Sequence, residues 1–164
     1  MSAVDHQHPL GGFKHALILV DCCTWCTWIC GMSGTSGMDV QEALWKFFCD
    51  AGGFPRKIQC DFDPRFLGGA AKAPLQAHGC CVNAAPLHCQ SQNGLVEKKW
   101  QTLTTMARTC LTDAKSPTKF WCWAIWEAAV RSDLLPISSD ETNPTNPEAL
   151  TTPFEAFHGQ KPDH

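Results

Sequence analysis

The sequence predicts one α/β domain whose functional groups lie at the ends of its strands. Residues 16–20 form a compact apolar run that is typical of a buried strand, and Asp21 follows it directly. Residues 57–60 indicate a second, shorter strand, which Asp61 follows in the same way. Stretches with helical spacing of apolar residues lie between and after these strands, which favours an α/β arrangement with a site at the strand ends. At 164 residues the chain is long enough for one core and too short for two.

The composition fits a soluble globular protein. Apolar residues make up 44% and charged residues 18% of the chain, and neither value indicates disorder. No apolar run approaches the ~18–20 residues that span a bilayer. Residues 1–12 lack the basic start and apolar stretch of a signal peptide, and we expect them to form a polar lead-in segment. We therefore expect a soluble, intracellular protein with no membrane partner.

The first half of the chain predicts a hairpin, a helix and a short strand in that order. Residues 25–32 alternate like a strand and follow residues 16–20 after a short turn, which predicts a hairpin. Asp39 is then expected to cap a helix that runs through Asp50, and Gly52 and Gly53 end that helix. Its apolar residues recur at helical spacing: Val40, Ala43, Leu44, Phe47 and Phe48.

The second half predicts two long helices after a polar loop. A short helix over residues 70–78 and a strand over 80–83 come first. The loop then leads into a helix with one apolar face: Val96, Trp100, Leu103, Ala107, Cys110 and Leu111. Pro117 suits the first turn of the next helix, which runs to about Leu134 and is apolar nearly all round, as in a buried or interface helix. Residues 138–152 read as a loop.

The charge is unevenly distributed. The whole chain carries a net charge of −3. Residues 62–119 nevertheless hold seven basic residues against three acids, whereas residues 133–164 hold six acids and the single base Lys161. A basic middle segment beside an acidic tail is compatible with a phosphate-binding face, and equally with a solvated mixed surface.

Eleven cysteines raise the question of a metal site or disulfides. Cys23 and Cys26 form a C-x-x-C pair, but no second clean pair follows, which argues against zinc. Without a secretory signal, disulfides are not expected either. Structural free thiols are the favoured interpretation.

Three carboxylates are candidates for a common site: Asp21, Asp61 and Glu97. Hard cations such as Mg²⁺ prefer oxygen ligands. Two such ions about 4 Å apart activate an attacking hydroxyl and stabilise the leaving oxygen in phosphoryl transfer. Asp21 would bridge the two ions, and the other two carboxylates would each hold one. Asp63 competes with Asp61 for its role, and Glu97 could instead be a simple partner of the helix dipole.

Several short segments of the sequence resemble, in the same order, those of a known protein family. Thirty-five residues separate Asp61 from Glu97. The surrounding segments are "HALILVD", "CDFDPRFLGG", "AAPLHCQSQNGLVEKKWQTL", "MARTCL", "FWCWAI" and "TTPFEAFHGQKPD". Together they resemble the integrase catalytic core of copia-type LTR retrotransposons, a branch of the retroviral integrase superfamily with the D,D-35-E signature. The resemblance covers the chain from about Gly12 to Asp163.

The resemblance implies an RNase H-like fold, with a mixed central sheet flanked by helices. The core would span residues 13–136, and residues 137–164 would be a C-terminal extension. It also implies 3′-end processing and strand transfer of retrotransposon DNA by a homo-oligomer that uses no small-molecule substrate. The protein would act in the nucleus and otherwise belong to a cytoplasmic particle. Asp21, Asp61 and Glu97 would hold Mg²⁺ or Mn²⁺. The implied DNA contacts are Gln92, Asn93 and Gly94 in a flap that meets the DNA end, and Lys98, Lys99 and Arg108 on the following helix.

Departures from the family pattern leave other interpretations open. Relatives usually carry arginines or a Thr-Pro near residues 87–89, where this chain has Leu-His-Cys. The chain could therefore be a catalytically inactive, nucleic-acid-binding RNase H-like module. A ribonuclease H would call for a fourth carboxylate, for which Glu127 and Asp133 are the candidates. His78 and His88 are expected to be surface or loop residues.

Overall fold

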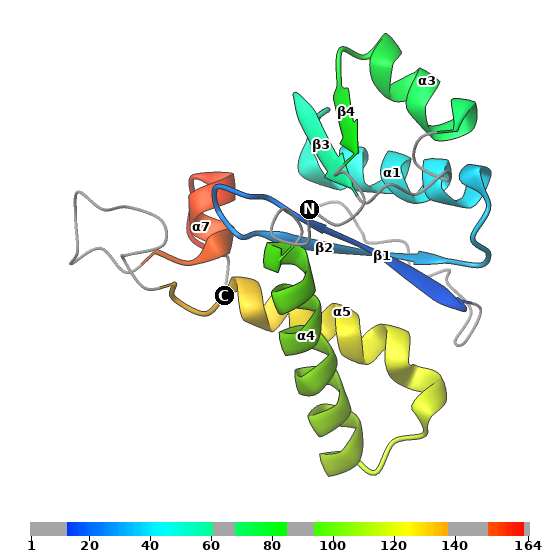
Figure 1. The fold of residues 1–164 in the computed structure, drawn as a ribbon. Helices are drawn as coiled ribbons and strands as arrows, with labels where there is room; N and C mark the ends of the chain where they lie inside the picture. The colour runs from blue at the N-terminus through cyan, green and yellow to red at the C-terminus, as the bar shows by residue number, and fades with distance from the viewer. Residues whose placement is uncertain (1–12, 61–67, 85–93, 138–150, 163–164) are drawn as a thin grey trace.

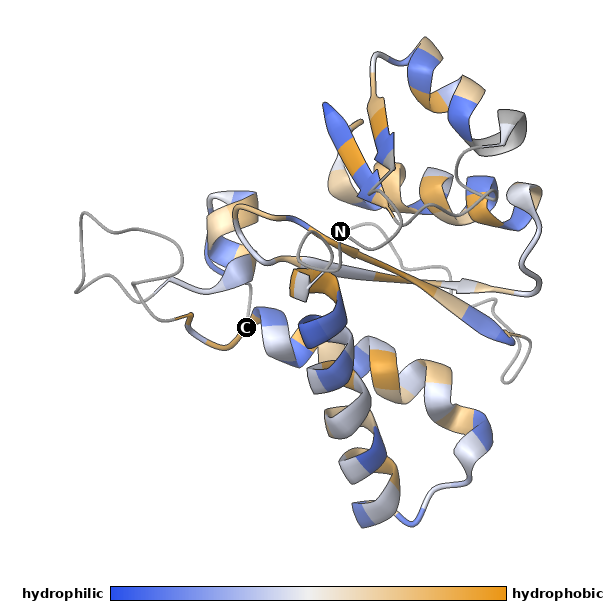
Figure 2. Ribbon diagram, in the orientation of Figure 1, coloured by the Kyte–Doolittle hydropathy of each residue, from blue (hydrophilic) through white to orange (hydrophobic). Residues whose placement is uncertain are grey.

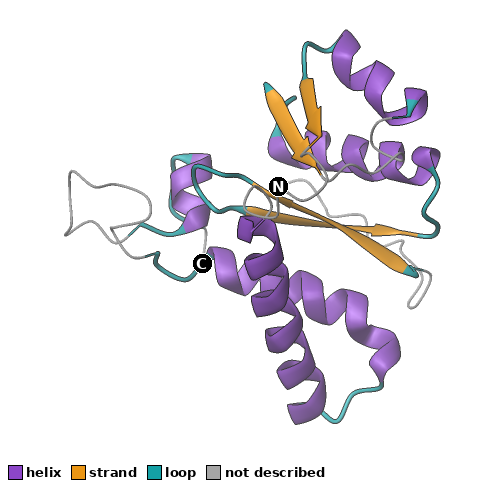
Figure 3. Ribbon diagram, in the orientation of Figure 1, coloured by secondary structure: helices purple, strands orange, loops and turns teal. Residues whose placement is uncertain are grey.

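The computed structural model describes residues 13–60, 68–84, 94–137 and 151–162, arranged as helices around short sheets (Figures 1 and 3). The predicted hairpin, helices and short strands are confirmed. In chain order the elements are β1 (His15–Val20), β2 (Thr27–Met32), α1 (Gly37–Ala51), β3 (Lys57–Cys60), α3 (Gly69–Ala77), β4 (Cys81–Ala84), α4 (Gly94–Asp113), the 3₁₀ turn η2 (Thr118–Phe120), α5 (Trp121–Asp133) and α7 (Pro153–His158).

The β1–β2 hairpin carries helices on both of its faces. The two strands are antiparallel, with Ile18 opposite Ile29 and Leu19 opposite Trp28. Because side chains alternate along a strand, neighbouring residues face opposite layers. Leu19 and Trp28 pack on the α1 side, whereas Ile18 and Ile29 pack on the α4–α5 side. The apolar residues of the hairpin therefore join two separate cores.

The larger of these cores, which we call the α1 cluster, lies between the hairpin, α1 and the β3–β4–α3 unit. It is made of ten buried residues: Cys30, Met32, Val40, Ala43, Leu44, Phe47, Phe48, Ile58, Leu75 and Cys80. The smaller α4–α5 cluster is made of Leu103, Ala107, Ala124, Ile125, Ala128 and Ala129. In Figure 2 the hydropathy of α1 and α5 alternates along each helix, as expected for helices with one buried face.

The sheet content is mixed, as predicted, but the ladders are divided into two pairs. β1 pairs with β2 in an antiparallel ladder, and β3 pairs with β4 in a parallel one. Within the described ranges no ladder joins β1 to β3. The strands that precede Asp21 and Asp61 are therefore not paired directly with each other in these ranges.

The start of α1 corrects one prediction. Ser36, not Asp39, is the N-cap: the Asp39 amide donates to Ser36 Oγ at 3.3 Å, and the Ser36 amide donates to an Asp39 carboxylate oxygen at 2.8 Å. This reciprocal capping box satisfies two amides that helix geometry leaves free. The hydrogen bonds from Ser36 lower the pKa of Asp39. Gly52, in the left-handed region at φ 75°, ends the helix as predicted.

Helix α7 was not predicted. Thr152 and Glu155 form a second capping box, and Pro153 occupies the first turn, so the sequence did contain a helix start signal. Phe157 of this helix meets Trp28 of β2 edge to face, with ring centroids 4.7 Å apart. The C-terminal segment is thus packed on the hairpin. No helix in the described segments is long and apolar enough to cross a membrane.

Candidate catalytic site

Asp21 closes the loop that joins β1 to β2. Its Oδ2 accepts hydrogen bonds from the amides of Cys23 (3.2 Å) and Thr24 (2.8 Å) and from the hydroxyl of Thr24 (2.8 Å). Its backbone amide also donates to the carbonyl of Cys26 at 2.9 Å. One carboxylate oxygen therefore fixes the side chain to its own loop, while Oδ1 takes part in none of these bonds.

The loop contains a strained residue. Trp25 has φ 64°, a left-handed value that is rare for a bulky side chain, and its amide donates to the Asp21 carbonyl at 2.8 Å. Such conformations cost of order 1–3 kcal/mol and persist only where surrounding contacts hold them. The contacts of the loop around Asp21 therefore hold it in one conformation that an ordinary turn would not adopt.

Glu97 lies in the first turn of α4, and its side chain is exposed. Helix α4 packs against α5 and against β1, the strand that ends at Asp21. At this position an acid also meets the positive end of the helix dipole, so both readings of Glu97 fit its placement. Gly94, the first residue of α4, has no left-handed φ, and a Cβ there would meet nothing within 4 Å.

The structure contradicts the expected role of Lys99 as an exposed DNA contact on this helix. It is buried, with 7% of its surface exposed, on the same face as Leu103 and Ala107. Its ammonium donates to Ser132 Oγ at 2.9 Å and forms an ion pair with Asp133 at 3.5 Å. The spacing of 99, 103 and 107 was the available signal, since residues four apart share a helix face. A buried ammonium is not available to DNA phosphates, so Lys99 is no longer assigned to DNA contact.

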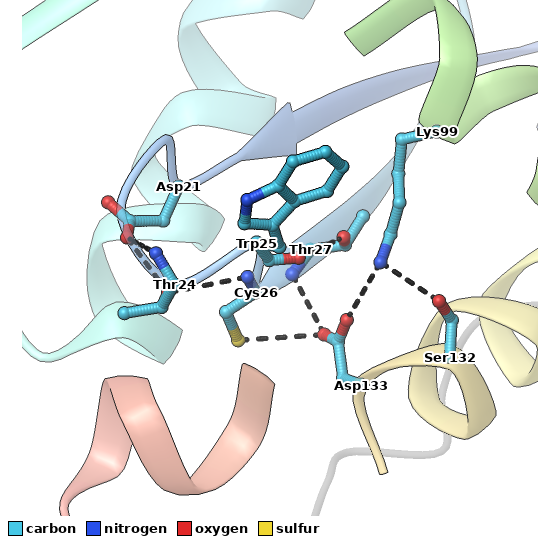
Figure 4. A network of polar contacts seen from close by, with 8 residues as sticks. All are labelled: Asp21, Thr24, Trp25, Cys26, Thr27, Lys99, Ser132 and Asp133. Carbon is cyan, nitrogen blue, oxygen red and sulfur yellow. Dashed lines mark hydrogen bonds and ion pairs between the residues drawn. The ribbon is translucent and has the colours of Figure 1, made fainter. Parts of the chain in front are cut away.

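Asp133 is a buried carboxylate with several polar partners, and from the sequence it was only a candidate for a fourth catalytic carboxylate. Its Oδ2 accepts from the Thr27 amide at 2.8 Å and from the Cys26 thiol at 3.5 Å, and its Oδ1 faces Lys99 (Figure 4). Burial raises the pKa of Asp133, against the opposing effects of the Thr27 amide and Lys99. Burial also raises the pKa of Cys26 to about 12, with the Asp133 charge as the next cause, so that thiol stays a donor.

The two candidate fourth carboxylates of a ribonuclease H are therefore both ion-paired. Asp133 pairs with Lys99, and Glu127 pairs with Arg131 at 2.7 Å on the exposed side of α5. These partners give each carboxylate a structural role. Asp133 nevertheless lies next to the loop of Asp21, because it accepts hydrogen bonds from Cys26 and Thr27 at the base of that loop.

Two other predicted DNA contacts lie on the surface of α4. Lys98 and Arg108 are both exposed. At 100° per residue, Glu97 and Arg108 fall on nearly the same face, about 17 Å apart along the axis. Asp61, Gln92 and Asn93 lie outside the described residues, as do Asp63 and His88. His78 stacks on Phe54, with ring centroids 4.1 Å apart.

A divalent cation at this site would need several oxygen ligands. Asp21 and Glu97 provide the carboxylate oxygens that Mg²⁺ prefers. Among the described residues no group of three or more potential ligands lies together, and Asp61 is not among those residues. The ten cysteines of these segments are free thiols, and three of them (Cys26, Cys30 and Cys80) are buried. Asp21 and Glu97 therefore have the ligand chemistry of a hard cation, and within the described segments no third ligand joins them.

Comparison with known proteins gives a result at the level of structure. No family model and no curated protein sequence matches the chain. The catalytic core domain of HTLV-2 integrase in complex with magnesium matches in its trimeric form with a TM-score of 0.68 and 17% identity, covering 87% of this chain and 84% of that one. Its dimeric form matches with a TM-score of 0.65 and 16% identity, covering 87% and 83%.

A larger assembly gives the same result. In the simian T-cell lymphotropic virus intasome bound to the PP2A regulatory subunit B56γ, a chain matches with a TM-score of 0.70 and 15% identity. The match covers 90% of this chain and 50% of that one. At these identities the likeness establishes the fold. The chain has the RNase H-like fold of retroviral integrase catalytic cores.

Proposed function

We propose that this protein is the catalytic core of a DNA integrase from a copia-type LTR retrotransposon. One observation carries the proposal: a chain with an integrase-core fold has Asp21 at the end of β1 and Glu97 in the first turn of α4, with thirty-five residues between Asp61 and Glu97. The fold supplies the scaffold, and the three carboxylates supply the chemistry. Its partner is DNA, its place of action the nucleus, and it needs no membrane or small-molecule substrate.

The reaction is transfer of a DNA strand between hydroxyl groups. In 3′-end processing, the oxygen of water attacks a phosphodiester near the DNA end and forms a P–O bond, and the bond between phosphorus and the 3′ oxygen of the retained strand breaks. The removed nucleotides keep the phosphate, and the retained strand ends in a 3′-OH. In strand transfer, the freed 3′-OH attacks a target phosphodiester, so that one P–O bond forms and another breaks. Asp21, Asp61 and Glu97 would hold two Mg²⁺ or Mn²⁺ ions. When bound, these ions would activate the attacking hydroxyl and stabilise the leaving oxygen.

The remaining side chains of the proposal position DNA. Lys98 and Arg108 are exposed on α4 and would contact phosphates, which set register without reading sequence. Gln92 and Asn93 precede the helix and would meet the DNA end, next to Gly94. The Asp21 loop contributes differently: with Oδ2 held by Cys23 and Thr24, Oδ1 stays oriented for a ligand.

Assembly into a homo-oligomer is supported by one face of α5. Four large apolar residues, three of α5 and its C-cap residue Leu134, recur at spacings of three and four and are exposed: Trp123 (41%), Trp126 (45%), Val130 (38%) and Leu134 (41%). A stripe of this kind is the pattern by which two helices pack. A second copy of the chain is the proposed occupant, and Trp126→Glu is expected to lower the sedimentation-derived mass towards that of a monomer.

The experiment that tests the activity is strand joining on a branched DNA substrate with Mg²⁺ or Mn²⁺. Glu97→Gln keeps the shape of the side chain and removes its charge, and we expect it to abolish joining while leaving the thermal midpoint near that of wild type. Glu127→Gln is the matched control, because it makes the same change at a carboxylate paired with Arg131. A folded wild type that binds DNA and joins no strands would instead identify a catalytically inactive binding module.

A further inference from the structure

A continuous set of polar contacts runs from the Asp21 loop to α4 (Figure 4). We call it the hairpin–helix network, and its members are Asp21, Thr24, Cys26, Thr27, Lys99, Ser132 and Asp133. The Thr24 hydroxyl donates to Asp21, and the Thr24 oxygen accepts from the Cys26 amide at 3.3 Å. Cys26 and Thr27 donate to Asp133, which pairs with Lys99. The network therefore connects Asp21, one proposed metal ligand, to Lys99 on α4, the helix whose first turn carries Glu97.

The ion pair at the centre of the network is nearly dry. The Lys99 and Asp133 side chains are 8% and 9% exposed. Removing two charges from water is so costly that well-packed apolar residues of similar size often stabilise a fold as well or better. Stability alone thus gives no reason for a lysine between Glu97 and Leu103 on the inner face of α4. Buried pairs of this kind are best attested where they fix a register.

Helix geometry relates the direction of Lys99 to that of Glu97, so a fixed Lys99 also fixes the rotation of α4 about its axis. At 100° per residue, Lys99 projects about 200° away from Glu97, so one points into the core while the other points to solvent. The α4–α5 cluster is built largely of alanines, which leave a helix free to rotate or slide more than interlocking large side chains do. The contact of Lys99 with Ser132 and Asp133 removes that freedom at the turn that carries Glu97.

We propose that Lys99 and Asp133 are positioning residues that set the separation and direction of the Glu97 and Asp21 carboxylates. Through Lys99 the pair fixes the rotation of α4. Through the Thr27 amide and the Cys26 thiol it fixes the base of the loop whose Thr24 holds Asp21. This inference rests on the proposed function, because it assigns the pair to the same metal site.

The test uses a variant in which neither charge is left buried alone. Lys99→Met with Asp133→Asn removes the ion pair, keeps similar volumes and leaves an acceptor for the Thr27 amide. The matched control is Glu127→Gln with Arg131→Gln, which removes an exposed ion pair from the same helix α5. Two quantities are measured without DNA: the dissociation constant for Mn²⁺ by calorimetry, and amide hydrogen exchange in the Asp21 loop. Exchange in the β3–β4 ladder is the internal reference.

The expected result is a folded double variant that binds Mn²⁺ about tenfold more weakly, the lower end of the range for residues that orient metal ligands. The amides of Cys23, Thr24 and Cys26 exchange faster in it, whereas the β3–β4 amides keep their wild-type rates. The control variant matches wild type in both measurements. A folded double variant with wild-type Mn²⁺ affinity and wild-type loop exchange overturns the proposal, and so does a double variant that does not fold, since the pair would then serve the fold alone.

Failure of the proposed function gives a different result. If Glu97→Gln binds Mn²⁺ as wild type does, the metal site is wrongly assigned. The link between α4 and the Asp21 loop is still decided, because faster exchange at Thr24 in the double variant requires no metal.

Discussion

The two cores of this protein are built from different kinds of side chain. The α1 cluster contains Phe47, Phe48 and Leu44, and its aromatic rings continue through Trp28 to Phe157. The α4–α5 cluster contains four alanines among its six buried residues, and a buried ion pair lies at its edge. Large interlocking side chains make the first core a source of stability, since burial free energy scales with apolar area. The second core permits close helix contact and sets the orientation of the residues beside the proposed site.

The largest effect is expected from breaking the buried pair on one side only. Lys99→Met leaves the Asp133 carboxylate without its cation, and truncating one partner of a buried pair costs about 3–5 kcal/mol in the free energy of unfolding. Urea denaturation followed by circular dichroism measures it. Adding Asp133→Asn should restore part of the loss. A single variant as stable as wild type would show that the pair is solvated.

A cavity in the α1 cluster is expected to be nearly as costly. Leu44 is 2% exposed at the centre of this cluster, and Leu44→Ala is expected to lower the free energy of unfolding by about 2–5 kcal/mol. Strand joining by the remaining folded protein should stay near the wild-type level, because the α1 cluster that contains Leu44 includes no residue of the hairpin–helix network. Loss of activity without loss of stability would contradict the division of roles between the two cores.

Titration of Asp133 beside the α4–α5 cluster and of Asp39 at the start of α1 should change the free energy of unfolding with pH in opposite directions. Burial raises the pKa of Asp133, so in the range just above the ordinary value of 3.8 the folded protein binds a proton that the unfolded chain has lost. Its contribution to stability is present below that range and is lost as pH rises through the folded pKa. Ser36 lowers the pKa of Asp39, so the contribution of Asp39 is present above 3.8 and is lost as pH falls through its folded pKa.

Two asparagine variants separate these contributions. Asp133→Asn is expected to remove a decrease in the free energy of unfolding with rising pH, and Asp39→Asn to remove an increase. Urea unfolding at a series of values from about pH 3 to 6 measures both slopes. The same sign of change in both variants would contradict the assigned environments.

The smallest effect is expected at the exposed pair on α5. Arg131→Gln breaks a contact of 2.7 Å with Glu127, yet both side chains are well exposed, at 63% and 44%. Solvent screening makes such pairs contribute little. The thermal midpoint should stay within measurement error of wild type. A clear drop would mean that distance, rather than burial, decides what an ion pair contributes here.

Local patterns predicted most of the fold. The apolar spacing of residues 40–48 and 96–111 placed α1 and α4, and alternation with a short turn placed the hairpin, because both signals are local and repeated. The division of the strands into two ladders depends on contacts between distant segments, which no local pattern encodes. Helix α7 was missed although Thr152 and Glu155 marked its start.

The site was predictable only in part, for a related reason. Asp21 and Glu97 could be chosen from the sequence because Asp21 directly follows a strand and Glu97 lies in the first turn of a helix. The number of residues between Asp61 and Glu97 can be counted in the sequence without a structure. Lys99 was misassigned because its charge outweighed its place in the row with Leu103 and Ala107. Its partner Asp133 lies 34 residues away, and their pairing follows from the packing of α4 on α5, which sequence alone does not specify.

The most direct test of the account is a crystal structure of the protein with Mn²⁺ bound, with anomalous scattering used to locate the ions. We expect two ions about 4 Å apart, with Asp21 between them and Asp61 and Glu97 each on one. Ions held by other residues, or a folded protein that takes up no Mn²⁺ at these three carboxylates, would contradict it.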